Sequence, residues 1–147
     1  MTSGRRHMAR RRTIQVLYQW DLTGQSSTEI KDELHFEQDI REFDIEYFQH
    51  LIRNIPTHVE AIDSVLSQCL DRDLITVDPV ERAILRLGVY ELRFRPEIPP
   101  RVVLNEAIEM SRVFGAEKGY RFVNGVLDRC QAVCNDSELP AAPAGVI

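Results

Sequence analysis

The chain has 147 residues, of which 44% are hydrophobic and 28% charged, and its formal net charge at pH 7 is −5. This length and apolar content suffice for one globular domain with its own core. There is no apolar run as long as a membrane span, no N-terminal secretory signal and no CxxC pair among the three cysteines. These features exclude a membrane-spanning protein and a disulfide framework, and they indicate a reducing, cytoplasmic compartment.

The charge is distributed unevenly along the chain. Residues 1–12 contain five arginines and no acidic residue, which leaves 13 of the 18 basic residues and all 23 acidic ones to the rest, a net charge of −10. A concentrated basic arm on an acidic body can bind a nucleic acid, because each neutralised phosphate releases counterions. The alternative is a solubilising or leader-like tail.

The first expected helix runs from about Ala9 to Leu22 and ends at Gly24, a residue suited to a helix C-terminus. Arginines at its start oppose the helix dipole, which suggests that they serve another purpose. Tyr18 lies two turns after Arg11, so an aromatic ring shares a face with the basic arm.

Two further helical patterns follow. Residues 26–36 have the apolar spacing of a short amphipathic helix, and residues 44–70 have that of a long one. Pro56 interrupts the second pattern, because proline removes a backbone donor and clashes with the preceding turn. We therefore expect a long element with a defect at Pro56.

A linker, residues 71–77, separates this element from the next. Leu74, Ile75 and Val77 are interspersed in it. Unless they fold into the core, these side chains make a small apolar patch, which suits a partner protein.

Residues 78–93 carry a full set of helix-start signals. Asp78 can cap the helix, Pro79 suits its first position, and Glu81 sits where its side chain can reach back to the cap. Apolar side chains then cover most of the helix circumference. We expect this helix to be central in the fold.

One basic stripe interrupts that apolar circumference. Arg82, Arg86 and Arg93 fall within about 40° of one another on a helix. We expect the stripe to be the only part of this helix that faces water. It either contributes to nucleic-acid binding or merely solvates the exposed edge of a core helix.

Two more helices are expected toward the C-terminus, over residues 101–114 and from about residue 116 or 118 to residue 134. The corner between them mixes aromatic and basic residues, which include Phe114, Lys118, Tyr120, Arg121 and Phe122. Aromatic rings stack on unpaired bases and cations meet phosphates, so the mixture suits a single-stranded nucleic acid. The alternative is that the two phenylalanines are core residues and the two cations face solvent.

The sequence contains no recognisable catalytic or metal-binding constellation. Its four histidines have neither metal-ligand spacing nor a nucleophile partner, and a glycine-rich phosphate loop is missing. Strand alternation of useful length is also missing. We therefore expect an all-α protein that is not an enzyme and needs no cofactor or metal, with structural cysteines.

Stretches in the first, central and last predicted helices resemble the NusB family of bacterial transcription antitermination factors: RRRTIQVLYQWDL, VERAILRLGVYEL and VVLNEAIEMSRVFGAEKGYRFVNGVLDR. The resemblance covers about residues 5–129, and NEAIE followed by FVNGVLD is its most specific part. It implies an all-α fold of two packed helical subdomains that form one compact domain of about six to seven helices. With this helical RNA-binding domain placed at residues 13–135, we expect the basic arm at residues 1–12 and, because residues 136–147 show no pattern, a disordered tail.

The resemblance also implies partners and site residues. The family binds the boxA element of ribosomal RNA leaders together with ribosomal protein NusE, and it supports processive antitermination by RNA polymerase with other Nus factors. The implied RNA-binding residues are Arg5, Arg6, Arg10, Gln15, Tyr18, Arg86, Phe114, Lys118, Arg121 and Phe122. The implied NusE-binding residues are Leu70, Leu74, Ile75, Val77, Val80 and Glu81.

Two departures from the family pattern carry predictions. Lys118 stands where an acidic or small residue is common, which predicts stronger or less specific RNA binding. Ile75 and Thr76 stand where acidic residues are expected, which predicts a more apolar NusE contact.

Two rival functions remain. One is a helical adaptor that binds only proteins. The other is the NusB-like domain that precedes the catalytic domain of certain ribosomal RNA cytosine methyltransferases, which we disfavour because no methyltransferase domain follows.

Overall fold

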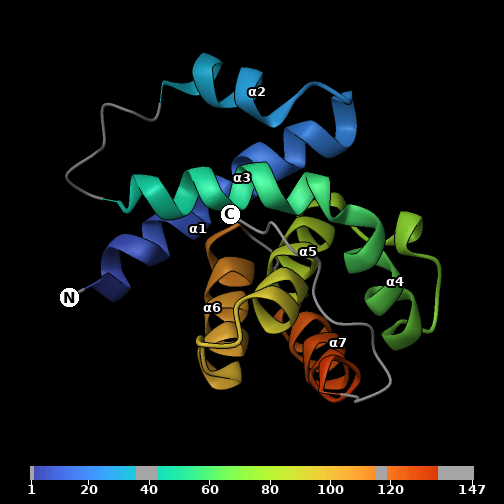
Figure 1. The fold of residues 1–147 in the computed structure, drawn as a ribbon. Helices are drawn as coiled ribbons and strands as arrows, with labels where there is room; N and C mark the ends of the chain where they lie inside the picture. The colour runs from blue at the N-terminus through green and yellow to red at the C-terminus, as the bar shows by residue number, and fades with distance from the viewer. Residues whose placement is uncertain (1, 36–42, 115–118, 136–147) are drawn as a thin grey trace. The chain divides into compact units, whose positions relative to one another are not determined.

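The computed structural model describes residues 2–35, 43–114 and 119–135. Within these ranges the chain forms seven α-helices and one 3-10 turn, and it contains no strand (Figure 1). It divides into two compact units, one within Met1–Thr57 and the other within His58–Val146. The prediction of an all-α fold with two helical subdomains and six to seven helices is confirmed. The predicted tail, residues 136–147, lies outside the described residues.

Unit 1 contains α1 (Thr2–Thr23), α2 (Ser27–Leu34) and α3 (Ile45–Thr57), which all contact one another (Figure 1). As predicted, Gly24 follows the C-terminus of α1. Its φ of 74° is one that glycine adopts without strain, and its N–H donates to Trp20 O at 2.9 Å. The largest fully buried side chains of this unit are Ile14, Leu17, Ile30, Phe43, Phe48, Leu51 and Ile55.

The start of α1 differs from the prediction. The helix begins at Thr2, not near Ala9, although its first turn has no acidic residue. Contacts with the chain just before α3 hold this end in place. Arg5 Nη2 donates to Phe43 O at 3.0 Å, and the N–H of Asp44 donates to Arg5 O at 3.0 Å. Because Phe43 is 38 residues further along the chain, local sequence signals could not reveal this support.

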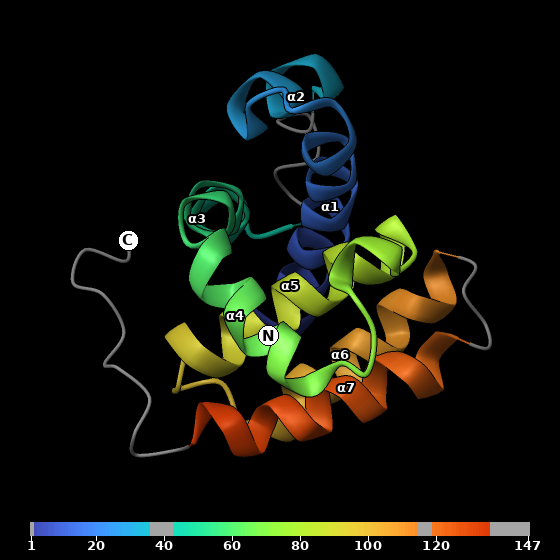
Figure 2. The same cartoon turned by 90° about the vertical axis from the view of Figure 1, so that its right-hand side faces the viewer.

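Unit 2 contains α4 (Val59–Cys69), the 3-10 turn η2 (Leu74–Thr76), α5 (Pro79–Phe94), α6 (Pro100–Val113) and α7 (Gly119–Cys134). Helix α7 packs against α4, α5 and α6, and α5 also contacts α4 and α6 (Figure 2). Helix α5 is buried along most of its length, as predicted for a central helix.

Local signals placed the start of α5 correctly. Asp78 Oδ2 accepts hydrogen bonds from the N–H groups of Val80 at 3.0 Å and Glu81 at 3.2 Å, so the predicted cap of α5 is confirmed. The expectation of one long element over residues 44–70 is wrong. Pro56 lies in the last turn of α3, and α4 is a separate helix. The disturbance that proline causes in the backbone hydrogen bonds is a helix end here.

The cysteines lie where α4 and α7 pack. All three are free, Cys69 and Cys130 are buried, and Cys134 is half-buried. Burial raises the pKa of the Cys130 thiol strongly, and burial raises the pKa of Cys134 to about 11. Such thiols are rarely ionised at neutral pH and react slowly. This agrees with the prediction of structural cysteines.

Gly88 is expected to be required by the packing of α5 on α7. A Cβ at this position would lie 2.8 Å from both Cδ atoms of Leu127, which is fully buried. Overpacking costs about 1–3 kcal/mol and exceeds the gain of up to about 1 kcal/mol in helix propensity. We expect Gly88→Ala to lower the free energy of unfolding by about 1 kcal/mol in urea denaturation. Gly125→Ala is the control, because its Cβ would approach only Arg129 Nη1, at 3.7 Å; equal stability of the two variants would contradict this prediction.

Candidate nucleic-acid and protein interfaces

In unit 1, the arginines at the start of α1 meet the start of α3. The guanidinium of Arg6 lies 4.2 Å from the centroid of the Tyr47 ring, and its Nε lies 3.8 Å from Asp44 Oδ2. Asp44 also accepts a hydrogen bond from the N–H of Tyr47 at 3.0 Å, so it caps α3 as well. The carboxylate of Asp44 therefore offsets part of the positive charge at the start of α1.

The predicted RNA-binding residues of unit 1 differ in exposure. Arg5, Gln15 and Tyr18 are exposed, and Gln15 and Tyr18 share a face of α1 because they are three residues apart. Arg6 is half-buried. Arg10 is only 3% exposed, so the expectation that it lines an accessible surface is wrong. Its guanidinium instead lies near the start of α3, 5.6 Å from the Tyr47 ring centroid.

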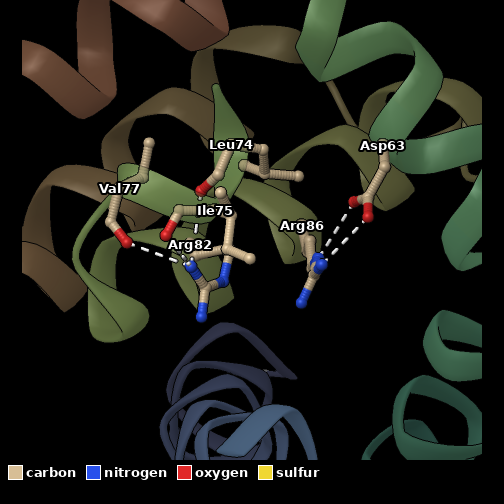
Figure 3. Close-up of polar contacts among 6 residues, drawn as sticks. All are labelled: Asp63, Leu74, Ile75, Val77, Arg82 and Arg86. Carbon is tan, nitrogen blue, oxygen red and sulfur yellow. Dashed lines mark hydrogen bonds and ion pairs between the residues drawn. The ribbon is translucent and has the colours of Figure 1, made fainter. Parts of the chain in front are cut away.

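The basic stripe of α5 does not face water as predicted. Arg82 and Arg86 are each only 8% exposed. Arg86 donates from Nε to Asp63 Oδ1 and from Nη2 to Asp63 Oδ2, both at 2.9 Å (Figure 3). The expectation that the stripe faces water is therefore wrong for these two arginines. Arg86 joins α5 to α4 through a bidentate ion pair.

Arg82 holds the linker between α4 and α5. Its Nη1 lies within hydrogen-bonding distance of three carbonyl oxygens, those of Leu74 at 3.3 Å, Ile75 at 3.2 Å and Val77 at 3.1 Å (Figure 3). One buried cation therefore donates to carbonyl oxygens of the η2 turn and of Val77, and the turn has no side-chain cap of its own. The turn is fixed by a residue of α5.

This arrangement divides the predicted apolar patch. Ile75 is 83% exposed, whereas Val77 is 1% exposed. Val77 therefore folds into the core and is not part of the surface patch, which was expected only of side chains outside the core. Leu70, Leu74 and Val80 are half-buried.

Glu81 borders this patch in an environment that disfavours its charge. Its Oε2 is buried and has no hydrogen-bond partner among the described residues. Burial raises the pKa of the carboxyl group, the Asp78 carboxylate raises it further, and the Arg72 guanidinium partly offsets both. An unpaired buried acceptor reduces stability. A bound partner with a hydrogen-bond donor would relieve this cost.

We expect Glu81→Gln to stabilise the free protein at pH 7. A carboxyl group whose pKa is higher in the folded state binds its proton more tightly there, so its contribution to stability falls as the pH rises through the raised pKa. At pH 7 the charged group is therefore unfavourable, whereas below about pH 3 it is almost entirely neutral in both states. Urea unfolding should show a stability difference at pH 7 that vanishes at about pH 3. A difference that is equal at both pH values would contradict this origin.

In unit 2, cations and aromatic rings gather where α6 ends and α7 begins. The guanidinium of Arg112 lies 5.0 Å from the centroid of the Tyr120 ring and that of Arg121 lies 5.8 Å from it. Arg121 Nε donates to the Tyr120 hydroxyl at 3.3 Å, and this bond together with both positive charges lowers the pKa of Tyr120. The guanidinium of Arg72 lies 4.9 Å from the centroid of the Phe122 ring. The surroundings of the Tyr120 oxygen thus favour negative charge.

The remaining predicted residues of this corner are Phe114, which is half-buried, and Lys118, which lies outside the described residues. Arg121 is exposed and Phe122 is half-buried. In the part of the chain that the structure describes, no three His, Cys, Asp or Glu side chains are grouped to hold a metal ion. None of the described helices is long and apolar enough to cross a membrane.

Comparison with known proteins agrees with this fold. The family model described as the NusB family matches residues 7–132. The chain belongs to the NusB family. It is 54% identical over 127 residues to the transcription antitermination protein NusB of Nitrosococcus oceani, an alignment that covers 86% of this chain and 85% of that relative. The predicted family is therefore confirmed, and the name of the relative agrees with the expectation of a protein that is not an enzyme.

Solved NusB structures have the same fold. The solution structure of NusB from Aquifex aeolicus matches with a TM-score of 0.79 and 32% identity, and the match covers 98% of this chain and 97% of that one. A crystal structure of antitermination factors NusB and NusE in complex with dsRNA matches with a TM-score of 0.77 and 32% identity, over 86% of this chain and 96% of that one.

Three residues of these candidate surfaces and their supports were not predicted from the sequence: Arg112, Arg72 and Asp63. Arg112 flanks the aromatic and basic corner, in which Tyr120 was already included, so composition could have suggested it. Arg72 and Asp63 could not be found in this way, because each meets its partner across a long sequence separation. Arg72 precedes Phe122 by 50 residues and Asp63 precedes Arg86 by 23.

Proposed function

We propose that this chain binds boxA-type single-stranded RNA of ribosomal RNA leaders together with ribosomal protein NusE. The complex would act in the cytoplasm and support processive transcription by RNA polymerase with other Nus factors. The observation that carries this proposal is the cluster of cations and aromatic rings at the corner of α6 and α7, in a chain of the NusB family. The match to a NusB–NusE structure with RNA supports it.

At the corner, the proposed roles follow from chemistry. Phe122 offers a ring for stacking on an unpaired base, and Arg121 and Arg112 offer guanidinium groups for phosphates. The Tyr120 hydroxyl can donate to a phosphate oxygen in the same positive field. Phe114 and Lys118 complete the contacts proposed in unit 2.

In unit 1, the proposed RNA contacts are Arg5, Arg6, Gln15 and Tyr18. Their exposed or partly exposed side chains provide two cations, an amide and an aromatic ring. Arg10 and Arg86 are not included, because they are buried and hold the fold. The acidic remainder of the chain would disfavour non-specific contact with RNA.

NusE is proposed to bind at the linker and the start of α5. The contact residues would be Leu70, Leu74, Ile75, Val80 and Glu81. Ile75 is the most exposed large hydrophobic side chain described, and an apolar side chain of this size stabilises a complex when it is buried in a partner. Glu81 supplies a buried carboxylate oxygen for which the described part of the chain offers no hydrogen-bond partner.

We expect Ile75→Ser to weaken NusE binding by roughly tenfold or more, because full burial of an isoleucine side chain is worth about 1.5–3 kcal/mol. The fold should be unaffected, since Ile75 is 83% exposed. Isothermal titration calorimetry with purified NusE measures the change. Leu22→Ser is the control, because Leu22 is an exposed hydrophobic residue of α1, at 52%. Equal loss of affinity in both variants would contradict the location of the surface.

The proposed function predicts that the chain, NusE and boxA RNA form one complex. Gel filtration of the chain with NusE and a labelled boxA strand should give one complex that contains all three components. A scrambled strand of equal length should elute separately. An adaptor that binds only proteins would elute with NusE and leave both strands behind, which would overturn the RNA part of the proposal.

A further inference from the structure

The linker, residues 71–77, contacts two neighbouring helices. Arg82 of α5 binds carbonyl oxygens in its C-terminal part. The guanidinium of Arg72 lies over the ring of Phe122 on α7. Just before the linker, Arg129 Nε of α7 donates to the carbonyl oxygen of Cys69, the last residue of α4, at 2.9 Å. The contact between Arg72 and Phe122 therefore connects the linker itself to the helix that begins at the aromatic corner.

Arg72 is the residue that relates most directly to both surfaces. Its backbone belongs to the linker, two residues before η2, and its side chain ends 4.9 Å from the Phe122 ring centroid. Its positive charge also acts on Glu81, whose pKa it lowers against the larger effects of burial and Asp78. The guanidinium thus contacts the aromatic ring and also acts electrostatically on the carboxylate of Glu81. All of these residues lie in unit 2.

We propose that Arg72 couples NusE binding to RNA binding, because its guanidinium connects the linker surface to the ring of Phe122. This inference rests on the proposed function. A partner that binds the linker favours the arrangement in which Arg72 lies over Phe122, which holds the ring in place for stacking and leaves a cation beside the RNA backbone. RNA that stacks on Phe122 fixes Arg72 and the linker in turn.

Linkage makes the inference quantitative. If NusE raises the affinity for RNA by a given factor, RNA must raise the affinity for NusE by the same factor. Couplings between distinct sites are typically about 5- to 150-fold. An exposed cation–π contact accounts for about two- to fivefold of such a factor. Removal of the Arg72 side chain should therefore reduce the factor by which NusE raises the affinity for RNA by about two- to fivefold.

The experiment measures RNA affinity by fluorescence anisotropy, with and without saturating NusE, for the wild type, Arg72→Gln, Arg72→Lys and Arg101→Gln. Arg101 is an exposed arginine in the first turn of α6, so its variant removes the same charge from unit 2. Arg72→Lys keeps the charge but stacks less well on a ring. A NusE titration with and without RNA checks that RNA raises the affinity for NusE by the same factor. Phe122→Leu, alone and combined with Arg72→Gln, completes a double-mutant cycle.

We expect the coupling factor to fall by about two- to fivefold in Arg72→Gln. It should fall less in Arg72→Lys, and Arg101→Gln should keep the wild-type factor. Phe122→Leu should lower the factor no further once Arg72 is replaced. A wild-type factor in Arg72→Gln, or a wild type that binds RNA equally with and without NusE, would overturn the inference and leave the proposed function intact. Failure of the wild type to bind RNA in the presence of NusE would instead refute the proposed function itself.

Discussion

Replacing Arg86 with methionine is expected to lower the free energy of unfolding by about 2 kcal/mol. The side chain makes two hydrogen bonds of 2.9 Å to the carboxylate of Asp63, and only about a tenth of it is exposed. Hydrogen bonds to charged groups are worth about 1.5–3 kcal/mol each, and we reduce the sum because the Asp63 side chain is 29% exposed. Urea denaturation followed by circular dichroism measures the loss.

Asp63 provides the matched variants. Asp63→Asn should destabilise the protein to a similar extent, and the double variant should lose less than the sum of the two, since both changes remove the same ion pair. Arg86→Lys should lie between the wild type and Arg86→Met, because an ammonium group cannot form both parallel bonds. Unchanged stability in Arg86→Met would contradict a structural role. It would return Arg86 to the candidates for RNA contact.

The double variant Arg112→Gln, Arg121→Gln is expected to lose about tenfold or more in RNA affinity at low salt, because two phosphate contacts are removed. Each contact with a single strand contributes about 0.7 to the slope of log affinity against log salt concentration, so the slope should become shallower by about 1.4. Stability should change little, since both side chains are exposed. Fluorescence anisotropy over a series of salt concentrations measures both quantities.

The control for this variant is Arg53→Gln, Arg101→Gln. These arginines are also exposed, one on α3 and the other on α6, and neither belongs to the corner. Both double variants change the net charge of the protein by the same amount, so a long-range electrostatic effect would appear in each. An equal slope change in the two variants would show that net charge, and not the corner, determines RNA affinity.

Short-range signals in the sequence were reliable guides to the fold. Asp78 and Pro79 mark the start of α5, Gly24 marks the end of α1, and Pro56 marks the end of α3. Each acts on backbone atoms within a few residues, through a cap, a left-handed φ or a missing donor. Sequence alone is sufficient for such features.

Predictions that required knowledge of distant contacts were less successful. Helical spacing correctly grouped Arg82 and Arg86, but it could not show that carbonyl oxygens and Asp63 take both side chains out of solvent. Helical spacing also could not show that Phe43 and Asp44 form hydrogen bonds with Arg5 at the start of α1. Charge patterns in the sequence indicated a nucleic-acid function. The structure was needed to show which of the arginines are exposed to solvent.

The proposed specificity for boxA RNA, strengthened by NusE, is tested most directly by competition anisotropy. A labelled boxA strand bound to the chain and NusE is displaced by unlabelled boxA or by a scrambled strand, at moderate salt so that non-specific contacts are weak. We predict that boxA competes at a much lower concentration than the scrambled strand and that omission of NusE narrows this difference. Equal competition by the two strands, unchanged by NusE, would contradict the proposed specificity.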